Sequence, residues 1–297
     1  MSVIFLILPD FLLIALGWSL LHVWRFTPHF FQQLEKLVYY VLFPALLFQS
    51  ITRTPISANQ ATTLFIATFG LIAAGVAMAW IVVPILRPDR AAHASLSQTA
   101  YRFNTYMALS LAGAWGNQAQ TTMAIMLGFA VPMVNVAAVH ALARKNGGIV
   151  KEIMRNPLII ATVLGLIWNL AQLPFPDTLG VTLDRLGACA IAIGLLCVGA
   201  ALSLHASRGR ERLIAWMIAV RLLAMPVVAI IIGLVLDLTL IERQVLLLFA
   251  ALPTASSAHV LAARMGGQPQ PVAVTMTTGT LLSAITLPLW LAIAQYL

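Results

Sequence analysis

The chain has 297 residues, of which 61% are hydrophobic and only 9% are charged. Soluble domains carry about 25% charged residues, so this composition excludes an ordinary soluble protein and predicts an integral membrane protein. The net charge of +8 would suggest a nucleic-acid partner in a soluble protein, but here the basic residues lie between apolar segments. We interpret them as topology determinants in a lipid bilayer and predict no nucleic-acid partner.

Apolar segments recur along the whole chain at the length of about 20 residues that a helix needs to cross a membrane. We therefore predict an all-α membrane protein with ten transmembrane helices. Their expected ranges are 3–23, 35–52, 61–86, 95–116, 119–143, 157–173, 183–204, 212–236, 243–264 and 271–296. The connections between these spans are too short to hold an extramembrane domain.

Basic residues are distributed unevenly among the connections. Loops after odd-numbered spans contain twelve Lys or Arg residues, and loops after even-numbered spans contain three. The first set is Arg25, Lys36, Arg87, Arg90, Arg144, Lys145, Lys151, Arg155, Arg208, Arg210, Arg212 and Arg264, and the second is Arg53, Arg185 and Arg243. The positive-inside rule places the first set in the cytoplasm. This predicts a multi-pass membrane protein with both termini on the outer side.

The two halves of the chain show weak internal similarity. Five spans in each half require a duplicated second half to insert upside down relative to the first. At an offset of 150, segment 111–120 matches segment 261–270 at a leucine, an alanine, a glycine and two glutamines. We predict that residues 1–143 and 157–297 form two inverted five-helix repeats joined by a cytoplasmic linker at 144–156.

The fourth and ninth spans each contain a stretch that is unusual in a membrane helix. Arg102 lies near the middle of span four, where a charged side chain costs about 3 kcal/mol, and Asn104 and Thr105 follow it. In span nine, Pro253 removes a helical hydrogen bond, and the offset of 150 carries Asn104 onto Thr254. We predict that helices four and nine are broken and cross at mid-membrane.

These irregular stretches also predict a site for an anion. Arg102 would supply positive charge, and the N-terminus of a half-helix presents free N–H groups to an anion. The other candidate substrate-binding residues are Asn104, Thr105, Asn135, Pro253, Thr254, Ala255, Ser256 and Ser257. Simpler readings stay open: Arg102 could pair with a helix C-terminus or reach the cytoplasmic face, Pro253 could mark a kink, and Asn135 could bond two helices together.

Among the other ionisable residues within the predicted spans, three need a separate interpretation. Asp10 is the candidate for coupling to H⁺ or Na⁺, and its alternative is a solvated carboxylate in an outward vestibule. His259 is a second coupling candidate because histidine titrates near neutral pH, although such a residue can also serve packing alone. For Arg221 we expect a structural partner. The sequence contains no clustered metal-ligand spacing and no phosphate loop, so we predict no metal and no cofactor.

The chain resembles the auxin efflux carrier family, which includes bacterial malate and malonate permeases. The resemblance covers essentially the whole chain and rests on LVYYVLFPALLF (37–48), RFNT (102–105), PMVN (132–135), NPLI (156–159) with Gly165, and ALPTA (251–255) with Met265 and Gly266. It implies ten helices in two inverted repeats, a substrate cavity beside the crossing helices, and an elevator-like cycle. Relatives often have a Gly and a Pro after the Asn of helix four, where this chain has YMALSL (106–111).

Together these features predict a secondary transporter of a small organic anion, a mono- or dicarboxylate, and not an enzyme. Two alternatives belong to other functional classes of membrane protein. One is a non-transporting membrane receptor or an anion channel on the same frame. The other, less favoured, is an intramembrane hydrolase, suggested by Ser256, Ser257 and His259. A homodimer is an assembly that the sequence allows.

Overall fold

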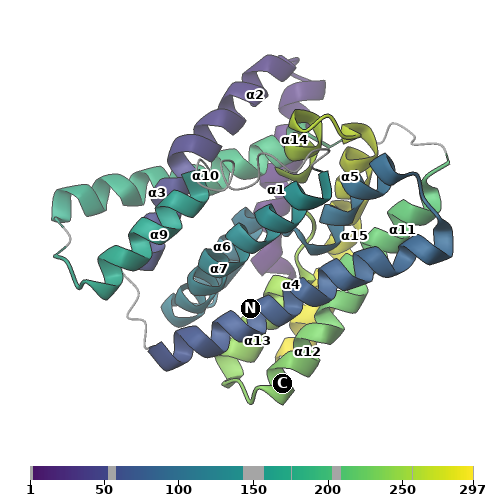
Figure 1. The fold of residues 1–297 in the computed structure, drawn as a ribbon. Coiled ribbons are helices and arrows are strands. Elements are labelled where there is room, and N and C mark those ends of the chain that lie inside the picture. The colour runs from purple at the N-terminus through teal and green to yellow at the C-terminus, as the bar shows by residue number, and fades with distance from the viewer. Residues whose placement is uncertain are drawn as a thin grey trace.

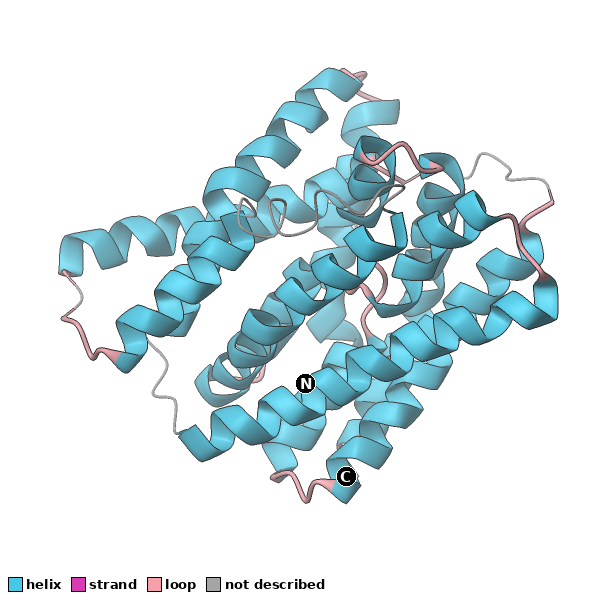
Figure 2. Cartoon of the chain, in the orientation of Figure 1, coloured by secondary structure: helices cyan, strands magenta, loops and turns pink. Residues whose placement is uncertain are grey.

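The structure, a computed structural model, describes residues 3–52, 58–142, 157–174, 176–202, 209–255 and 257–296, and their regular structure is helical without any strand (Figure 2). The segments in chain order are α1 (Val3–His22), α2 (Pro28–Leu37), η1 (Val38–Leu42), α3 (Phe43–Thr52), α4 (Ala58–Leu86), α5 (Arg90–Tyr101), α6 (Thr105–Ala114), α7 (Asn117–Leu142), α9 (Pro157–Leu170), α10 (Asp177–Ala200), α11 (Glu211–Ala219), η2 (Val220–Ala224), α12 (Met225–Val235), α13 (Leu240–Ala251), α14 (Ser257–Arg264) and α15 (Pro269–Ala294). The predicted linker 144–156 lies outside the described residues.

The described helices overlap the predicted spans, but several helix starts were predicted too late, among them that of α5, which begins at Arg90 instead of 95. Segments α2, η1 and α3 run on from Pro28 to Thr52, so span two begins before the predicted residue 35. The Thr27 hydroxyl accepts a hydrogen bond from the Phe30 N–H, and proline suits the first helical position, so the helix starts there. Helix α10 begins at Asp177 instead of 183, because an acidic residue in the first turn favours a helix start.

Helix α7 is the most enclosed of the long apolar helices. Five stretches of the described chain are long and apolar enough to cross a membrane: 61–86, α7, α10, 211–235 and α15. In α7, 72% of the most apolar window is buried, against 28% in α4. Exposed apolar side chains such as Phe69 and Trp80 line α4 instead, as expected for a helix that faces lipid. The protein is therefore a multi-pass, all-helical membrane protein with α7 in its interior.

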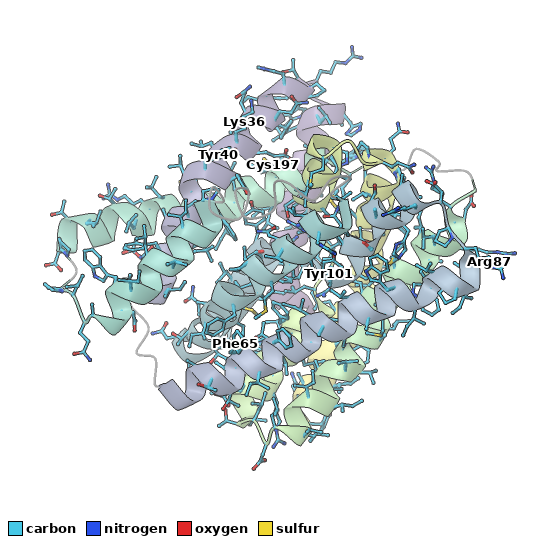
Figure 3. The ribbon with its side chains drawn as sticks, in the orientation of Figure 1. Lys36, Tyr40, Phe65, Arg87, Tyr101 and Cys197 are labelled. Atoms are coloured by element: carbon cyan, nitrogen blue, oxygen red, sulfur yellow. The ribbon has the colours of Figure 1, made fainter. Side chains whose placement is uncertain are left out.

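The helices pack in two groups that meet along α6 and α7 (Figure 1). In the first group, α1 packs along α10, and α3 packs against α9 and α10. In the second, α4, α12 and α13 pack on one another. Figure 3 shows Arg87 pointing outward from the end of α4, whereas Tyr101 at the end of α5 lies inside the molecule. The interior position of Tyr101 brings the residues that follow it to the centre of the fold.

Helices α1 and α10 touch backbone to backbone. A Cβ atom on Gly17 would lie 2.0 Å from the carbonyl oxygen of Leu196, and one on Gly199 would lie 1.9 Å from that of Ile14. No side chain fits at such distances, and small residues are what allow membrane helices to approach this closely. We infer that α1 and α10 behave as one rigid pair.

Two helices contain a wide π-helical turn that ends two residues before a proline. Turn η1 precedes Pro44, and η2 precedes Pro226. Proline has no N–H to donate, and its ring clashes with the carbonyl four residues earlier, which accounts for the widened turns. Such turns are frequent at functional sites. Turn η1 carries Tyr39 and η2 carries Arg221, and both side chains lie near the centre described next.

Candidate functional site

Span four is interrupted at residues 102–104. After α5, Arg102 has the extended backbone angles φ −81° and ψ 142°. Helix α6 then starts behind Asn104, whose side-chain oxygen accepts hydrogen bonds from the backbone N–H groups of Tyr106 and Met107 at 3.1 and 3.2 Å. This is a helix N-cap, a position that asparagine strongly favours. Asn104 thus restarts the helix without the proline that relatives often have.

Span nine is interrupted between Ala251 and Ser257, within which Ser256 lies outside the described residues. Leu252 is extended, with φ −64° and ψ 145°, because a residue before proline is disfavoured in the helical region. The end of α13 is capped by Arg221, whose Nε donates to the Leu252 carbonyl and whose Nη2 donates to the Phe249 carbonyl, both at 2.7 Å. Arg221 therefore has the structural partners that we expected for it.

The two interruptions are in direct contact. The Asn104 backbone N–H donates to the carbonyl of Pro253 at 2.8 Å, and the Thr254 hydroxyl donates to the carbonyl of Thr99 at 2.8 Å. The rings of Phe103 and Phe249 lie 4.2 Å apart between their centroids. Non-helical backbone in a membrane protein must find hydrogen-bond partners inside the protein, and here each interruption supplies some of them for the other.

A cavity lies beside this contact. It is lined by Tyr39, Phe43, the consecutive residues Arg102, Phe103, Asn104, Thr105 and Tyr106, then Val131, Val134, Asn135, Ala255 and Ser257. The centre of a water molecule can move through about 60 Å³ of it. Since one water needs about 10–15 Å³ by this measure, the cavity has room for several waters or for a small organic molecule.

The cavity contains a buried guanidinium group with spare hydrogen-bonding capacity. Arg102 is 6% exposed, and its Nη2 donates to the Asn135 side-chain oxygen at 3.0 Å and to the Ser257 hydroxyl at 3.1 Å. Both partners are neutral. Within the described part of the chain, Arg102 Nη1 and the Asn104 side-chain nitrogen are buried without a hydrogen-bond partner. Two donor nitrogen atoms, each an NH2 group, and one positive charge thus remain for a ligand.

The simpler readings of Arg102 do not fit this geometry. Its guanidinium neither caps a helix C-terminus, as that of Arg221 does, nor reaches a surface. Asn135 does bond two helical elements, but its partner is Arg102 itself, in the cavity wall. The sequence alone left these readings open, and the packing of α7 against the interruption distinguishes them.

The predicted site residues divide into two sets. Arg102, Asn104, Thr105, Asn135, Ala255 and Ser257 line the cavity. Pro253 and Thr254 do not, because they join the two interruptions. Sequence reasoning missed the aromatic wall of Tyr39, Phe43 and Tyr106. Tyr39 and Phe43 are four residues apart, on one face of a helix, but the same spacing is found in helices that face lipid.

The two coupling candidates lie outside the cavity. Asp10 is 2% exposed and accepts a hydrogen bond from the Ser110 hydroxyl at 2.8 Å, so the reading of a solvated vestibule carboxylate is wrong. His259 donates from Nδ1 to the Pro269 carbonyl at 3.0 Å. The Ser257 hydroxyl is bonded to Arg102, which provides no support for a hydrolase pair of Ser257 with His259.

Comparison with known proteins identifies the class of this molecule. Residues 145–291 match the pattern of the family described as "Membrane transport protein". Over these residues the chain is similar to that family of transport proteins. It is also similar to a protein of Rhizobium meliloti (strain 1021) named "Putative malonate transporter", with 26% identity over 297 residues, 95% of this chain and 92% of the relative. The resemblance to the auxin efflux carrier family is confirmed, and the protein is a transporter and not an enzyme.

The cap at Asn104 leads to a prediction about the transporter's stability. Replacing Asn104 by alanine removes the acceptor for the Tyr106 and Met107 N–H groups, so we expect a loss of about 1 kcal/mol of stability. Asn104→Asp keeps the acceptor and should keep the stability, while its negative charge beside Arg102 should weaken anion binding. Thermal unfolding in detergent, with and without ligand, measures both effects. Equal stability of wild type and Asn104→Ala would show that the Asn104 cap does not stabilise the protein.

Proposed function

We propose that the protein is a secondary transporter of a small organic anion, a mono- or dicarboxylate, that binds in the cavity beside residues 102–104. The observation that carries this proposal is the buried Arg102 guanidinium with a free N–H arm and only neutral partners. Hydrogen bonds between a guanidinium and a carboxylate are charge-assisted and therefore strong. A fixed cation in a cavity of low dielectric constant repels a cationic substrate.

Each polar group of the cavity wall then has a role. Arg102 Nη1 and the Asn104 amide nitrogen would meet the carboxylate, and the hydroxyls of Thr105 and Ser257 would bond the rest of the substrate. The rings of Tyr39, Phe43 and Tyr106 also line the cavity and would supply apolar contacts to the substrate. The name of the Rhizobium meliloti relative makes malonate the first anion to test.

The proposal includes a transport mechanism and a topology. Residues 1–143 and 157–297 would form two inverted five-helix repeats, with the two interruptions crossing at mid-membrane, in the bacterial cytoplasmic membrane with both termini outside. One helical group would move against the other in an elevator-type cycle. The contact between Asn104 and Pro253, near equivalent points of the two halves, supports this arrangement. Cycles of this kind are commonly driven by H⁺ or Na⁺, for which Asp10 and His259 are the candidate residues.

A carrier and a channel with this same fold would differ in how they take up substrate into reconstituted liposomes. We expect uptake of labelled malonate to saturate and to be accelerated by unlabelled malonate on the opposite side, because a carrier returns faster when it is loaded. A thermal-shift screen of mono- and dicarboxylates identifies the ligand if malonate fails. Uptake that rises linearly with concentration and ignores malonate on the far side would favour a channel, and a stabilising ligand that is not transported would favour a receptor.

A further inference from the structure

Asp10 is a buried acid of α1 that lies against α6, a helix along which the two helical groups meet. Its Oδ1 accepts the hydrogen bond from Ser110. Its Oδ2 is buried without a hydrogen-bond partner among the described residues. A buried carboxylate without compensation is costly, and an acid within a membrane helix is a functional candidate for that reason. A proton on Oδ2 removes the charge.

Among the residues that the structure describes, none of the helices packed on α1 brings a cation to Asp10 that could compensate a charge. Three helices pack on α1, namely α6, α10 and α15. Their titratable or charged residues are Tyr106 on α6 and Asp177, Asp184, Arg185, Cys189 and Cys197 on α10, while α15 has none. Asp184 bonds Gln49 of α3, and Arg185 is exposed. Within the described chain, Ser110 is the one side chain that hydrogen bonds Asp10.

A proton suits this place better than a metal cation. Hard cations in proteins take about six oxygen ligands, whereas Asp10 and Ser110 offer one carboxylate and one hydroxyl. No cluster of three or more His, Cys, Asp or Glu residues occurs in the described parts of the chain. The place of Asp10 therefore suits one proton on a carboxylate oxygen better than it suits a metal ion.

The position of Asp10 links that proton to movement. Helix α1 is joined rigidly to α10 through Gly17 and Gly199, whereas Ser110 belongs to α6, which begins directly after the cavity residues 102–104. The Tyr106 ring of α6 packs directly on Gly194 of α10: a Cβ atom added to Gly194 would lie 2.5 Å from the nearest atom of that ring. Displacement of α6 along α1 and α10 would uncover Asp10 to water.

We propose that Asp10 is the proton-binding residue of this transporter: it is protonated while α6 covers it and gives the proton to water when α6 moves. This inference rests on the proposed function for its transport step. The proton adds to Oδ2 from water on one side of the membrane and leaves to water on the other. His259 differs from Asp10 in its contacts. It lies on α14, and its hydrogen-bond partner Pro269 begins α15, the next helix in the chain, which packs against α14.

Infrared spectroscopy of the protein in lipid bilayers tests the protonation without any substrate. At neutral pH the wild type should show the C=O stretching band of a protonated carboxyl group, because solvated carboxyls titrate near pH 4. The band should vanish in Asp10→Asn, persist in Asp10→Glu, and shift in Ser110→Ala, which loses the hydrogen bond. Identical spectra of wild type and Asp10→Asn in this region overturn the proposal.

Transport in liposomes tests the coupling. A pH gradient should drive about tenfold accumulation of malonate per pH unit in wild type, the ratio that one proton per substrate sustains. Asp10→Asn should lose this accumulation and keep malonate exchange, whereas the control Asp177→Asn, at an exposed acid in the first turn of α10, should keep both. Gradient-driven accumulation in Asp10→Asn equal to wild type overturns the coupling role. If wild type itself does not bind or exchange any carboxylate, the proposed function fails, and the infrared result still decides the protonation of Asp10.

Discussion

Replacing Arg102 by alanine should abolish carboxylate binding and leave the fold intact. The substitution removes the positive charge of the cavity wall and the free Nη1 arm. Losing one partner of a buried charge pair costs about 3 kcal/mol, which is about 100-fold in Kd. The fold should survive because the partners left behind, Asn135 and Ser257, are neutral and border a cavity that water can enter.

Two matched variants sharpen this experiment. Arg102→Lys keeps the charge but loses the planar fork of donors, so we expect an intermediate loss of about 10-fold in Kd. Arg90→Ala changes an exposed arginine at the other end of the same helix, α5, and should bind like wild type. Calorimetric titration with malonate measures affinity, and circular dichroism reports the fold. An unchanged Kd in Arg102→Ala would show that Arg102 does not bind the carboxylate.

Replacing Gly199 by alanine should prevent correct packing of the first helical group. The added Cβ would meet only backbone atoms, with the carbonyl oxygen of Ile14 at 1.9 Å and the backbone nitrogen of Trp18 at 2.9 Å. Backbone cannot rotate away as a side chain can, so α1 and α10 must separate. Overpacking typically costs about 1–3 kcal/mol, and we expect at least the upper end of that range here.

Gly279 provides the matched control, because it lies within helix α15 and a Cβ there would meet no heavy atom within 4 Å. Gly279→Ala should be neutral or stabilising, since alanine is favoured over glycine in a helix by about 1 kcal/mol. The yield of monodisperse protein and the thermal midpoint in detergent compare the two. If Gly199→Ala matches wild type in both, the backbone contact between α1 and α10 is not rigid.

Much of the site could be predicted from single residues whose chemistry conflicts with a membrane helix. Arg102 and Pro253 stand out because a charge and a missing N–H are costly at membrane depth. Asn104 carries the strongest local signal, since asparagine is a preferred N-cap and the structure uses it as one. The aromatic wall escaped prediction because Tyr39 and Phe43 are ordinary residues in an apolar helix, and nothing local distinguishes a ring that faces a cavity from one that faces lipid.

The partners of the buried polar groups could not be predicted in the same way. Ser110 lies 100 residues from Asp10, and Ser257 lies 155 residues from Arg102. The sequence also left Arg102 and Arg221 as similar anomalies, although one lines a cavity and the other caps α13. The difference comes from which helix each guanidinium faces, and that depends on the packing of the whole bundle.

The amino-acid sequence by itself determined that the chain crosses the membrane many times, where its helices lie, and where two of them carry residues unsuited to a helix. These are local properties, because every backbone group in lipid must be satisfied within its own helix. The tertiary structure decided which helix is central, that the two interruptions touch, and which polar side chains share one cavity. Such contacts join residues far apart in the chain, and they form only when close packing, such as that of Gly17 and Gly199, sets the distances between helices.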